Sequence, residues 1–185
     1  HMREKVDLPE RVEAVERPRT DVPPEWYYPY EASGADVPPL APFGTGFRYH
    51  ITGLFHDRSG FPTERVDEIE PWIRRVTAKI ERNLSHILHY TEEEVQGART
   101  LVLSYGASAR AAHHAVVAAR ARRHRVGFMK LLTLWPVPVE AVAAAAQGVR
   151  TVIVPEMNLG QVALEVERVV GRGKVRRVGR ADGQM

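Results

Sequence analysis

From about residue 100 onward, short apolar runs alternate with longer segments of helical pattern, and this alternation constrains the fold more than any other feature of the chain. The apolar runs lie at 100–106, 125–134 and 150–156, and a weaker one lies at 174–179. The helical segments between them lie at 107–124, 136–148 and 159–170. Strands that alternate with helices predict a parallel sheet with right-handed crossovers. Because the runs are continuously apolar, both faces of the sheet should be covered. We therefore expect a three-layer α/β domain over residues 97–180.

The segment that precedes this domain is different in character. Residues 3–62 are rich in proline, which disfavours long helices and central strands. The aromatic run WYYPY (26–30) is typical of a segment that packs within the protein or against a missing partner. Residues 47–54 alternate well enough to predict a short strand, which could join the edge of the sheet or belong to another domain. His1 and Met2 are interpreted as the remnant of an expression tag, so the chain is expected to begin inside a longer protein.

A single amphipathic helix is expected to connect the two parts, within residues 63–96. Pro71 suits the first position of a helix. The apolar stripe that follows is spaced by three and four residues, as on one helix face. It comprises Ile69, Ile73, Val76, Ile80, Leu84 and Ile87.

Composition excludes several classes of protein. The 185 residues include no cysteine, which rules out disulfides, a thiolate nucleophile and cysteine-ligated iron–sulfur clusters within this chain. No apolar run approaches the ~20 residues of a membrane span, so we expect a soluble, cytoplasmic protein with no membrane partner. The net charge of +3 permits an acidic partner without requiring one. The basic residues at 120–125 are explained by the helix dipole, and we expect no nucleic acid partner.

Ligands of open α/β sheets favour the carboxyl ends of the strands, and two turns are expected there. The first is SYGASAR (104–110), in which Gly106 permits a tight turn and Ser108 can cap the following helix. Tyr105, Gly106 and Ser108 are therefore candidates for ligand binding or docking, with the first-turn N–H groups as an anion site. The same residues also fit a capped turn without a ligand. The pattern is neither a full dinucleotide fingerprint nor a Walker motif.

The second turn is PEMNLGQ (155–161). Pro155 is expected to stop the strand, Asn158 to cap a helix that begins at Leu159, and Gly160 to let that helix approach a neighbouring backbone. Glu156 and Met157 would then lie on an exposed crest. Three roles stay open for Glu156: an interface anchor, a ligand contact, or a catalytic acid or base. The last normally needs a second convergent group, and the sequence shows none.

Histidines offer no convincing metal site. His86 and His89 are three residues apart on one helix, whereas His113 and His114 are adjacent and do not face one another. His56 and Asp57 lie in a turn held by Gly60 and Pro62, where we expect hydrogen bonding between domains.

Four motifs in this order resemble the alpha subunits of 2-oxoacid:ferredoxin oxidoreductases, particularly the 2-oxoglutarate type. They are HDRSGFPT (56–63), LVLSYGASAR (101–110), LLTLWPVP (131–138) and VIVPEMNLGQ (152–161). The resemblance covers roughly residues 20–170. It implies a domain similar to the transketolase C-terminal domain, with a mostly parallel five-stranded sheet and one antiparallel edge. Residues 3–62 then correspond to the tail of a preceding pyrimidine-binding domain.

The resemblance also implies what the parent enzyme does. The family decarboxylates a 2-oxoacid oxidatively with thiamine diphosphate and magnesium, passes electrons through an iron–sulfur cluster to ferredoxin, and transfers the acyl group to coenzyme A. The partners implied are a beta subunit, ferredoxin through the complex, and further copies in a homo-oligomer. No catalytic residue maps onto this chain, and no cofactor is expected on it. Assembly and docking are its expected role, with Trp135 joining His56 and Asp57 as interdomain candidates.

Two other functions compete with this interpretation. A small-ligand module could bind coenzyme A or a nucleotide at the 104–110 turn. A stand-alone nucleic-acid binder would require strongly salt-dependent affinity for duplex.

Overall fold

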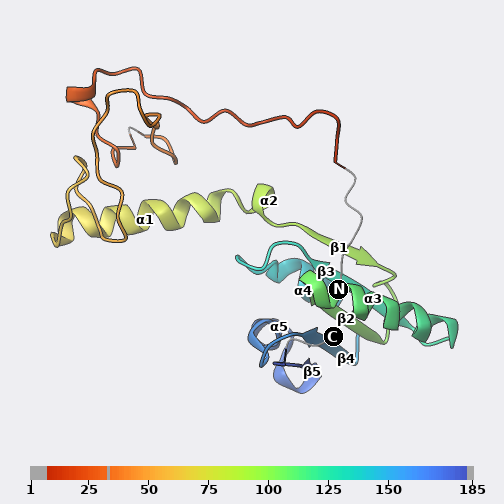
Figure 1. Cartoon of the computed structure of the whole chain (residues 1–185). Helices are drawn as coiled ribbons and strands as arrows, with labels where there is room; N and C mark the ends of the chain where they lie inside the picture. The colour runs from red at the N-terminus through yellow and green to blue at the C-terminus, as the bar shows by residue number, and fades with distance from the viewer. Residues whose placement is uncertain (1–7, 33, 183–185) are drawn as a thin grey trace. The chain divides into compact units, whose positions relative to one another are not determined.

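A computed structural model describes residues 8–32 and 34–182. The chain divides into two compact units, one ending at Asn83 and one beginning at Leu84, and each is considered by itself (Figure 1). The division falls inside the predicted connecting segment 63–96. Within the described part of the chain, no helix has both the length and the apolar character needed to cross a membrane.

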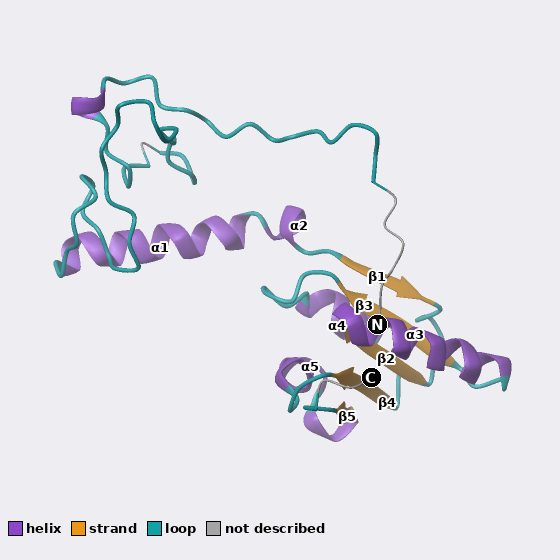
Figure 2. Ribbon diagram, viewed as in Figure 1, coloured by secondary structure: helices purple, strands orange, loops and turns teal. Residues whose placement is uncertain are grey.

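The second unit is built on a single five-stranded sheet with the order β1-β3-β2-β4-β5. Its strands are β1 (Tyr90–Glu93), β2 (Thr100–Tyr105), β3 (Val126–Leu131), β4 (Thr151–Glu156) and β5 (Val175–Gly179). Its helices are α2 (Leu84–Ile87), α3 (Gly106–Ala121), α4 (Val139–Ala145), α5 (Gln161–Val170) and the short η2 (Arg172–Lys174). Strands β2 to β5 are parallel, and β1 pairs antiparallel to β3. Figure 2 shows β1 and β5 at the two edges. The predicted fold, mostly parallel with one antiparallel edge, is confirmed.

Two apolar cores lie on opposite faces of this sheet. Successive strand residues point to opposite faces, so Leu101 and Leu103 pack with α4 and α5, whereas Val102 packs with α3. Met129 is fully buried on the α4 and α5 side, and Phe128 is buried against α3. The three layers expected from the sequence are therefore present.

The strand predicted over residues 47–54, which was left open as an edge strand or as part of another domain, is absent. Residues 47–54 contain no strand and belong to the first unit, so that prediction is wrong. The edge is β1, whose four residues are all exposed and mostly polar. Such a strand has no apolar periodicity to reveal it. It is held by the ladder from Tyr90–Leu131 to Glu93–Phe128, and Arg120 of α3 donates to the Glu93 carbonyl oxygen at 2.9 Å. The sheet therefore begins before residue 97.

The first unit contains η1 (Pro24–Trp26) and one long helix, α1 (Val66–Arg82). The helix predicted to run through residue 87 is interrupted at Asn83, whose side-chain amide donates to the Lys79 carbonyl oxygen at 2.7 Å. It also starts earlier than expected, so Pro71 lies inside α1 rather than at its first position. Pro71 has no N–H group for the Asp67 carbonyl, but the helix continues because it lies only one turn from the start.

Two tyrosines of the aromatic run 26–30 pack within this unit, which is one of the two outcomes that the sequence left open. The Tyr27 ring makes edge contacts with Phe47 and Tyr49, at centroid distances of 5.2 and 5.3 Å. Tyr30 stacks on His56 at 4.5 Å. Few side chains of the unit are fully buried, however, and Trp26, Phe43 and Ile51 remain largely exposed. Much of the apolar surface of this unit therefore lacks a covering layer of its own.

Candidate functional site

The candidate site begins with Glu156, the last residue of β4. Its side chain is buried, with only 3% exposed. Its two carboxylate oxygens accept backbone N–H groups from the first turn of α5, Val162 to Oε2 and Ala163 to Oε1, both at 3.0 Å. A carboxylate in this position satisfies two N–H groups that the helix cannot satisfy itself and complements the helix dipole. The predicted exposed position of Glu156 is therefore wrong.

Pro155 does not stop the strand either. It remains within β4 and lies opposite Val178 of β5. The Pro155 carbonyl faces β2, where it accepts the Ser104 hydroxyl at 2.8 Å. In an extended strand a residue's N–H and C=O point to the same side, so the missing N–H of Pro155 also faces β2. Because this position faces β2, the proline removes no hydrogen bond from the β5 side. It removes none from the β2 side either, because the β2–β4 ladder already ends at Ile153.

Asn158 shapes the turn that follows. Its Oδ1 accepts the N–H groups of Gly160 at 2.8 Å and Gln161 at 3.0 Å. It thus satisfies N–H groups at the start of the helix as predicted, but α5 begins at Gln161 rather than Leu159, and Gly160 occupies the N-cap position. Asn158 and Glu156 share the cap: the amide takes the first N–H groups and the carboxylate takes the next two.

Gly160 does not provide the close backbone approach that was predicted for it. Gly160 has φ +104°, a left-handed conformation that favours glycine. A Cβ there would meet the Arg177 side chain at 3.1 Å, not a neighbouring backbone. The close backbone approach occurs instead at Gly179 of β5, where a Cβ would lie 2.6 Å from the Asn158 carbonyl oxygen. Gly179 was not identified from the sequence. A glycine at the end of a predicted strand is the signal that could have indicated this close approach.

Tyr105, the last residue of β2, joins the two strand ends. Its hydroxyl donates to Glu156 Oε2 at 3.3 Å and accepts from Asn158 Nδ2 at 2.7 Å. Burial raises the pKa of the Tyr105 phenol above its ordinary value, and the charge of Glu156 adds to this effect. The phenol therefore stays protonated and can act as a donor to Glu156.

The first candidate turn also differs from its prediction. Helix α3 begins at Gly106, whose φ of +51° fits the expected tight turn. Ser108 consequently lies within the first helical turn, and its hydroxyl donates to the Tyr105 carbonyl at 3.1 Å. It does not cap an N–H group, because the helix starts two residues before it.

The structure brings some of the sequence-predicted residues together and leaves others apart. Tyr105, Glu156 and Asn158 form one hydrogen-bonded group, while Ser108 and Met157 line a neighbouring apolar groove. Trp135 lies in the loop after β3 and is 74% exposed. His56 and Asp57 belong to the first unit.

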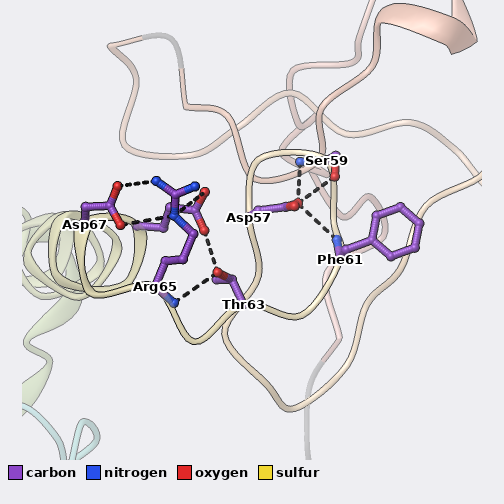
Figure 3. A network of polar contacts seen from close by, with 7 residues as sticks. Asp57, Ser59, Phe61, Thr63, Arg65 and Asp67 are labelled. Atoms are coloured by element: carbon purple, nitrogen blue, oxygen red, sulfur yellow. Dashed lines mark hydrogen bonds and ion pairs between the residues drawn. The ribbon is translucent and has the colours of Figure 1, made fainter.

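His56 and Asp57 are engaged inside their own unit. The Thr52 hydroxyl lies 2.7 Å from His56 Nε2, and the His56 side chain is buried. Figure 3 shows Asp57 Oδ1 accepting three hydrogen bonds, from Ser59 N at 2.8 Å, Ser59 Oγ at 2.6 Å and Phe61 N at 3.1 Å. The Ser59 hydroxyl and these N–H groups hold the pKa of Asp57 below its ordinary value. Both side chains stabilise the 56–62 turn.

These contacts limit the chemistry available at the candidate site. The Glu156 carboxylate is directed at helix N–H groups, and Tyr105 and Asn158 are bonded to it and to each other. Among residues 8–32 and 34–182, no group of three or more His, Asp or Glu side chains could hold a metal ion. The arrangement fits a rigid structural junction better than a catalytic pair.

Large apolar side chains lie in the loops that follow β3 and β4, at the same edge of the sheet as this junction. The carboxyl ends of β2, β3 and β4 meet there because these strands are parallel. Leu159 is 85% exposed in the loop after β4, and Leu132, Leu134 and Trp135 are exposed in the loop after β3. We call these four residues the apolar edge. A polar network satisfied from within, beside exposed apolar side chains, is typical of a docking surface.

A family comparison identifies the domain that this fold and edge define. Residues 98–185 match the family described as pyruvate:ferredoxin oxidoreductase core domain II. Over these residues the second unit is therefore similar to a domain of the 2-oxoacid:ferredoxin oxidoreductases.

Individual relatives make the assignment more specific. The chain is 41% identical over 170 residues to the 2-oxoglutarate synthase subunit KorA of Methanothermobacter thermautotrophicus, and 35% identical to that of Methanocaldococcus jannaschii. Each match covers 91% of this chain and 45% of the relative, so the chain spans less than half the length of these relatives. The resemblance to the 2-oxoglutarate-type subunit is confirmed: this chain is a KorA-like segment.

A solved structure shows the same fold. It is described as 2-oxoglutarate:ferredoxin oxidoreductase from Magnetococcus marinus with 2-oxoglutarate, coenzyme A and succinyl-CoA bound. The match has a TM-score of 0.73 at 24% identity and covers 90% of this chain and 30% of that one. These comparisons support the subunit interpretation and not the alternative of a separate ligand-binding module.

Proposed function

We propose that this chain is the assembly and docking part of an alpha subunit in a 2-oxoacid:ferredoxin oxidoreductase that acts on 2-oxoglutarate. The observation that carries the proposal is the 41% identity to a KorA subunit along 170 residues. The parent reaction would be oxidative decarboxylation with transfer of the acyl group to coenzyme A and of electrons to ferredoxin. The solved structure with coenzyme A and succinyl-CoA bound supports coenzyme A as the co-substrate.

We assign the cofactors of this reaction to other parts of the parent enzyme. These 185 residues include no cysteine, so cysteine ligands for an iron–sulfur cluster would come from outside them. Thiamine diphosphate and magnesium would be held by the pyrimidine-binding domain together with the beta subunit. Residues 3–62 would be the tail of that domain, which accounts for their exposed aromatic and aliphatic side chains.

The apolar edge is the proposed contact with a neighbouring domain or subunit. Its role follows from the contrast between Glu156, which is buried and fully engaged, and Leu159, which is 85% exposed three residues later. Docking would cover Leu159 and Trp135 and release water from their surfaces. The assembly would contain a beta subunit and more than one copy of this chain.

The complete enzyme, with its alpha and beta subunits, tests this proposal. We would measure coenzyme A-dependent reduction of ferredoxin with 2-oxoglutarate, pyruvate and 2-oxoisovalerate as substrates. We expect the highest kcat/KM with 2-oxoglutarate, and a clear preference for another 2-oxoacid would overturn the substrate assignment.

A second measurement tests the docking role directly. A Trp135→Ala, Leu159→Ser double variant should reduce assembly in size-exclusion chromatography with light scattering. Leu164→Ser is the control, because Leu164 is 53% exposed on α5 and lies outside the apolar edge. Equal assembly of the double variant and the wild type would show that the edge is not an interface.

A further inference from the structure

The α3 face of the sheet carries an apolar groove of about 470 Å³ that is distinct from the apolar edge. Helices α4 and α5 cover the other face, whereas α3 packs mainly on β2 and β3 and only partly on β4. Within the described residues of the second unit, α3 is the helix of this face and extends only partly over β4, and β5 is the edge strand beyond it (Figure 2). Val178 of β5, which lines the groove, is 55% exposed.

The residues that line the groove come from the sheet and from one face of α3. Its floor consists of Val102, Ile153, Pro155 and Val178. One wall is formed by Ala111, Ala115 and Ala119, which are spaced by four residues and so form one line along α3. Small side chains in such a line let a second helix approach closely and pack along α3.

The charges around the groove define the partner further. Arg180 lines it at the carboxyl ends of the strands. Arg176 points to the same face of β5 as Val178, two residues away, and is exposed. At the opposite end Arg122 follows Ala119 by three residues and continues its line beyond the helix.

The acidic side chains at the groove, Glu156 and Asp182, already have hydrogen-bond or ion-pair partners. Glu156 is the acidic residue among the groove-lining side chains, and both of its oxygens are bound to α5. Asp182 forms an exposed ion pair with Arg180, which contributes little stability and exchanges readily.

From this combination we propose that the groove binds an amphipathic α-helix of a partner subunit, with an apolar stripe toward α3 and acidic residues beside the stripe. Recognition would follow the helix-in-groove mode, in which apolar side chains at i, i+3, i+4 and i+7 enter the groove. The arginines at both ends would fix its position and favour acidic flanks over basic ones. The proposal rests on the assignment of this chain to a multi-subunit enzyme, but concerns a different surface from the apolar edge.

The test uses the 185-residue chain and two synthetic peptides labelled with fluorescein. Both peptides carry the same leucine and alanine stripe at helical spacing. One has glutamate at the flanking positions and the other has lysine. Fluorescence anisotropy should show that the acidic peptide binds at least about tenfold more tightly than the basic one. Equal affinity for the two peptides, or binding of neither, would overturn the proposal.

A matched pair of variants locates the binding. Ala115→Arg places a long side chain in the groove and should abolish binding of the acidic peptide, although it adds positive charge. Ala121→Arg adds the same charge at another exposed position of α3, which is two residues from Ala119 and does not line the groove, and should leave binding intact. Circular dichroism confirms that both variants fold. Equal behaviour of the two variants would mean that the peptide binds elsewhere.

This result is separable from the proposed enzyme function. Peptide binding is measured without substrate, cofactor or beta subunit. A parent enzyme with another substrate would leave the groove result unchanged. An unoccupied groove would leave the 2-oxoglutarate activity unchanged.

Discussion

Glu156 and Ala163 are joined by a hydrogen bond of 3.0 Å from the Ala163 N–H to the buried Glu156 carboxylate. This bond connects the end of β4 to the first turn of the helix that follows it. Charge-assisted bonds of this kind are stronger than neutral ones, and they leave unsatisfied donors when the acceptor is removed.

Glu156→Ala should therefore destabilise the second unit. The substitution leaves the Val162 and Ala163 N–H groups without their acceptor and creates a small cavity. We expect a loss of about 2–3 kcal/mol in the free energy of unfolding. Urea denaturation followed by circular dichroism measures it. Glu165→Ala is the control on the same helix, because Glu165 forms an exposed ion pair with Arg168 and accepts no N–H group of the first turn among the described residues. Similar losses for the two variants would show that the capping bonds contribute nothing special.

Three glycine substitutions should separate lack of space from backbone strain. Gly179→Ala brings a Cβ to 2.6 Å from a backbone oxygen that cannot move aside, and should cost about 1–3 kcal/mol. Gly160→Ala meets the flexible Arg177 side chain but imposes a left-handed residue, and should cost about 1 kcal/mol. Gly173→Ala has open space and no such φ, so it serves as the control. Unfolding free energies that rank Gly173→Ala as the most damaging would contradict this account.

Edge strand β1 should detach more easily in acid. The Glu93 carboxylate lies 3.0 Å from His113 Nε2, and contacts with His113 and Arg120 lower the pKa of Glu93. A lowered pKa in the folded state gives stability that is present above the unfolded pKa of about 4.5 and is lost as pH falls through the folded value. Because Glu93 is half exposed, the effect at pH 7 should be no more than about 1 kcal/mol.

Glu93→Gln tests this pH dependence. Thermal melts of the wild type and the variant should differ at pH 7 and converge as the pH falls below 4. Glu92→Gln is the control, because Glu92 precedes Glu93 in β1 and, among the described residues, forms no ion pair with His113 or Arg120. A difference that persists unchanged at pH 3 would mean that the Glu93 charge is not responsible.

The turn at residues 57–61 should open when Asp57 is replaced. Asp57→Ala removes the acceptor of three hydrogen bonds, and the exposed segment around Arg58 should become a better trypsin substrate. Limited proteolysis with mass spectrometry would show faster cleavage after Arg58. Glu64→Ala is the control, because Glu64 is exposed just outside the turn. An unchanged cleavage rate at Arg58 would indicate that Gly60 and Pro62 alone hold the turn.

Local sequence pattern was sufficient for the four parallel strands and the helices between them. The runs around Leu101, Met129 and Val152 are apolar without interruption, and only burial on both faces of a sheet satisfies them. The motifs at the strand ends also carried the family resemblance, because each of them is a continuous run of residues in the chain. Composition alone excluded disulfides, a thiolate nucleophile and cysteine-ligated clusters within these 185 residues, because they include no cysteine.

Other features depended on contacts between distant residues. Strand β1 is polar and exposed, so pairing with β3 decides that it is a strand, whereas 47–54 alternates but has no partner strand. Glu156 looks exposed in sequence because it is charged and stands beside Pro155. Its burial is decided by two N–H groups six and seven residues later and by a tyrosine from another strand. A pattern of neighbouring residues reports periodicity, but only the folded chain brings a carboxylate to the helix start that stabilises its charge.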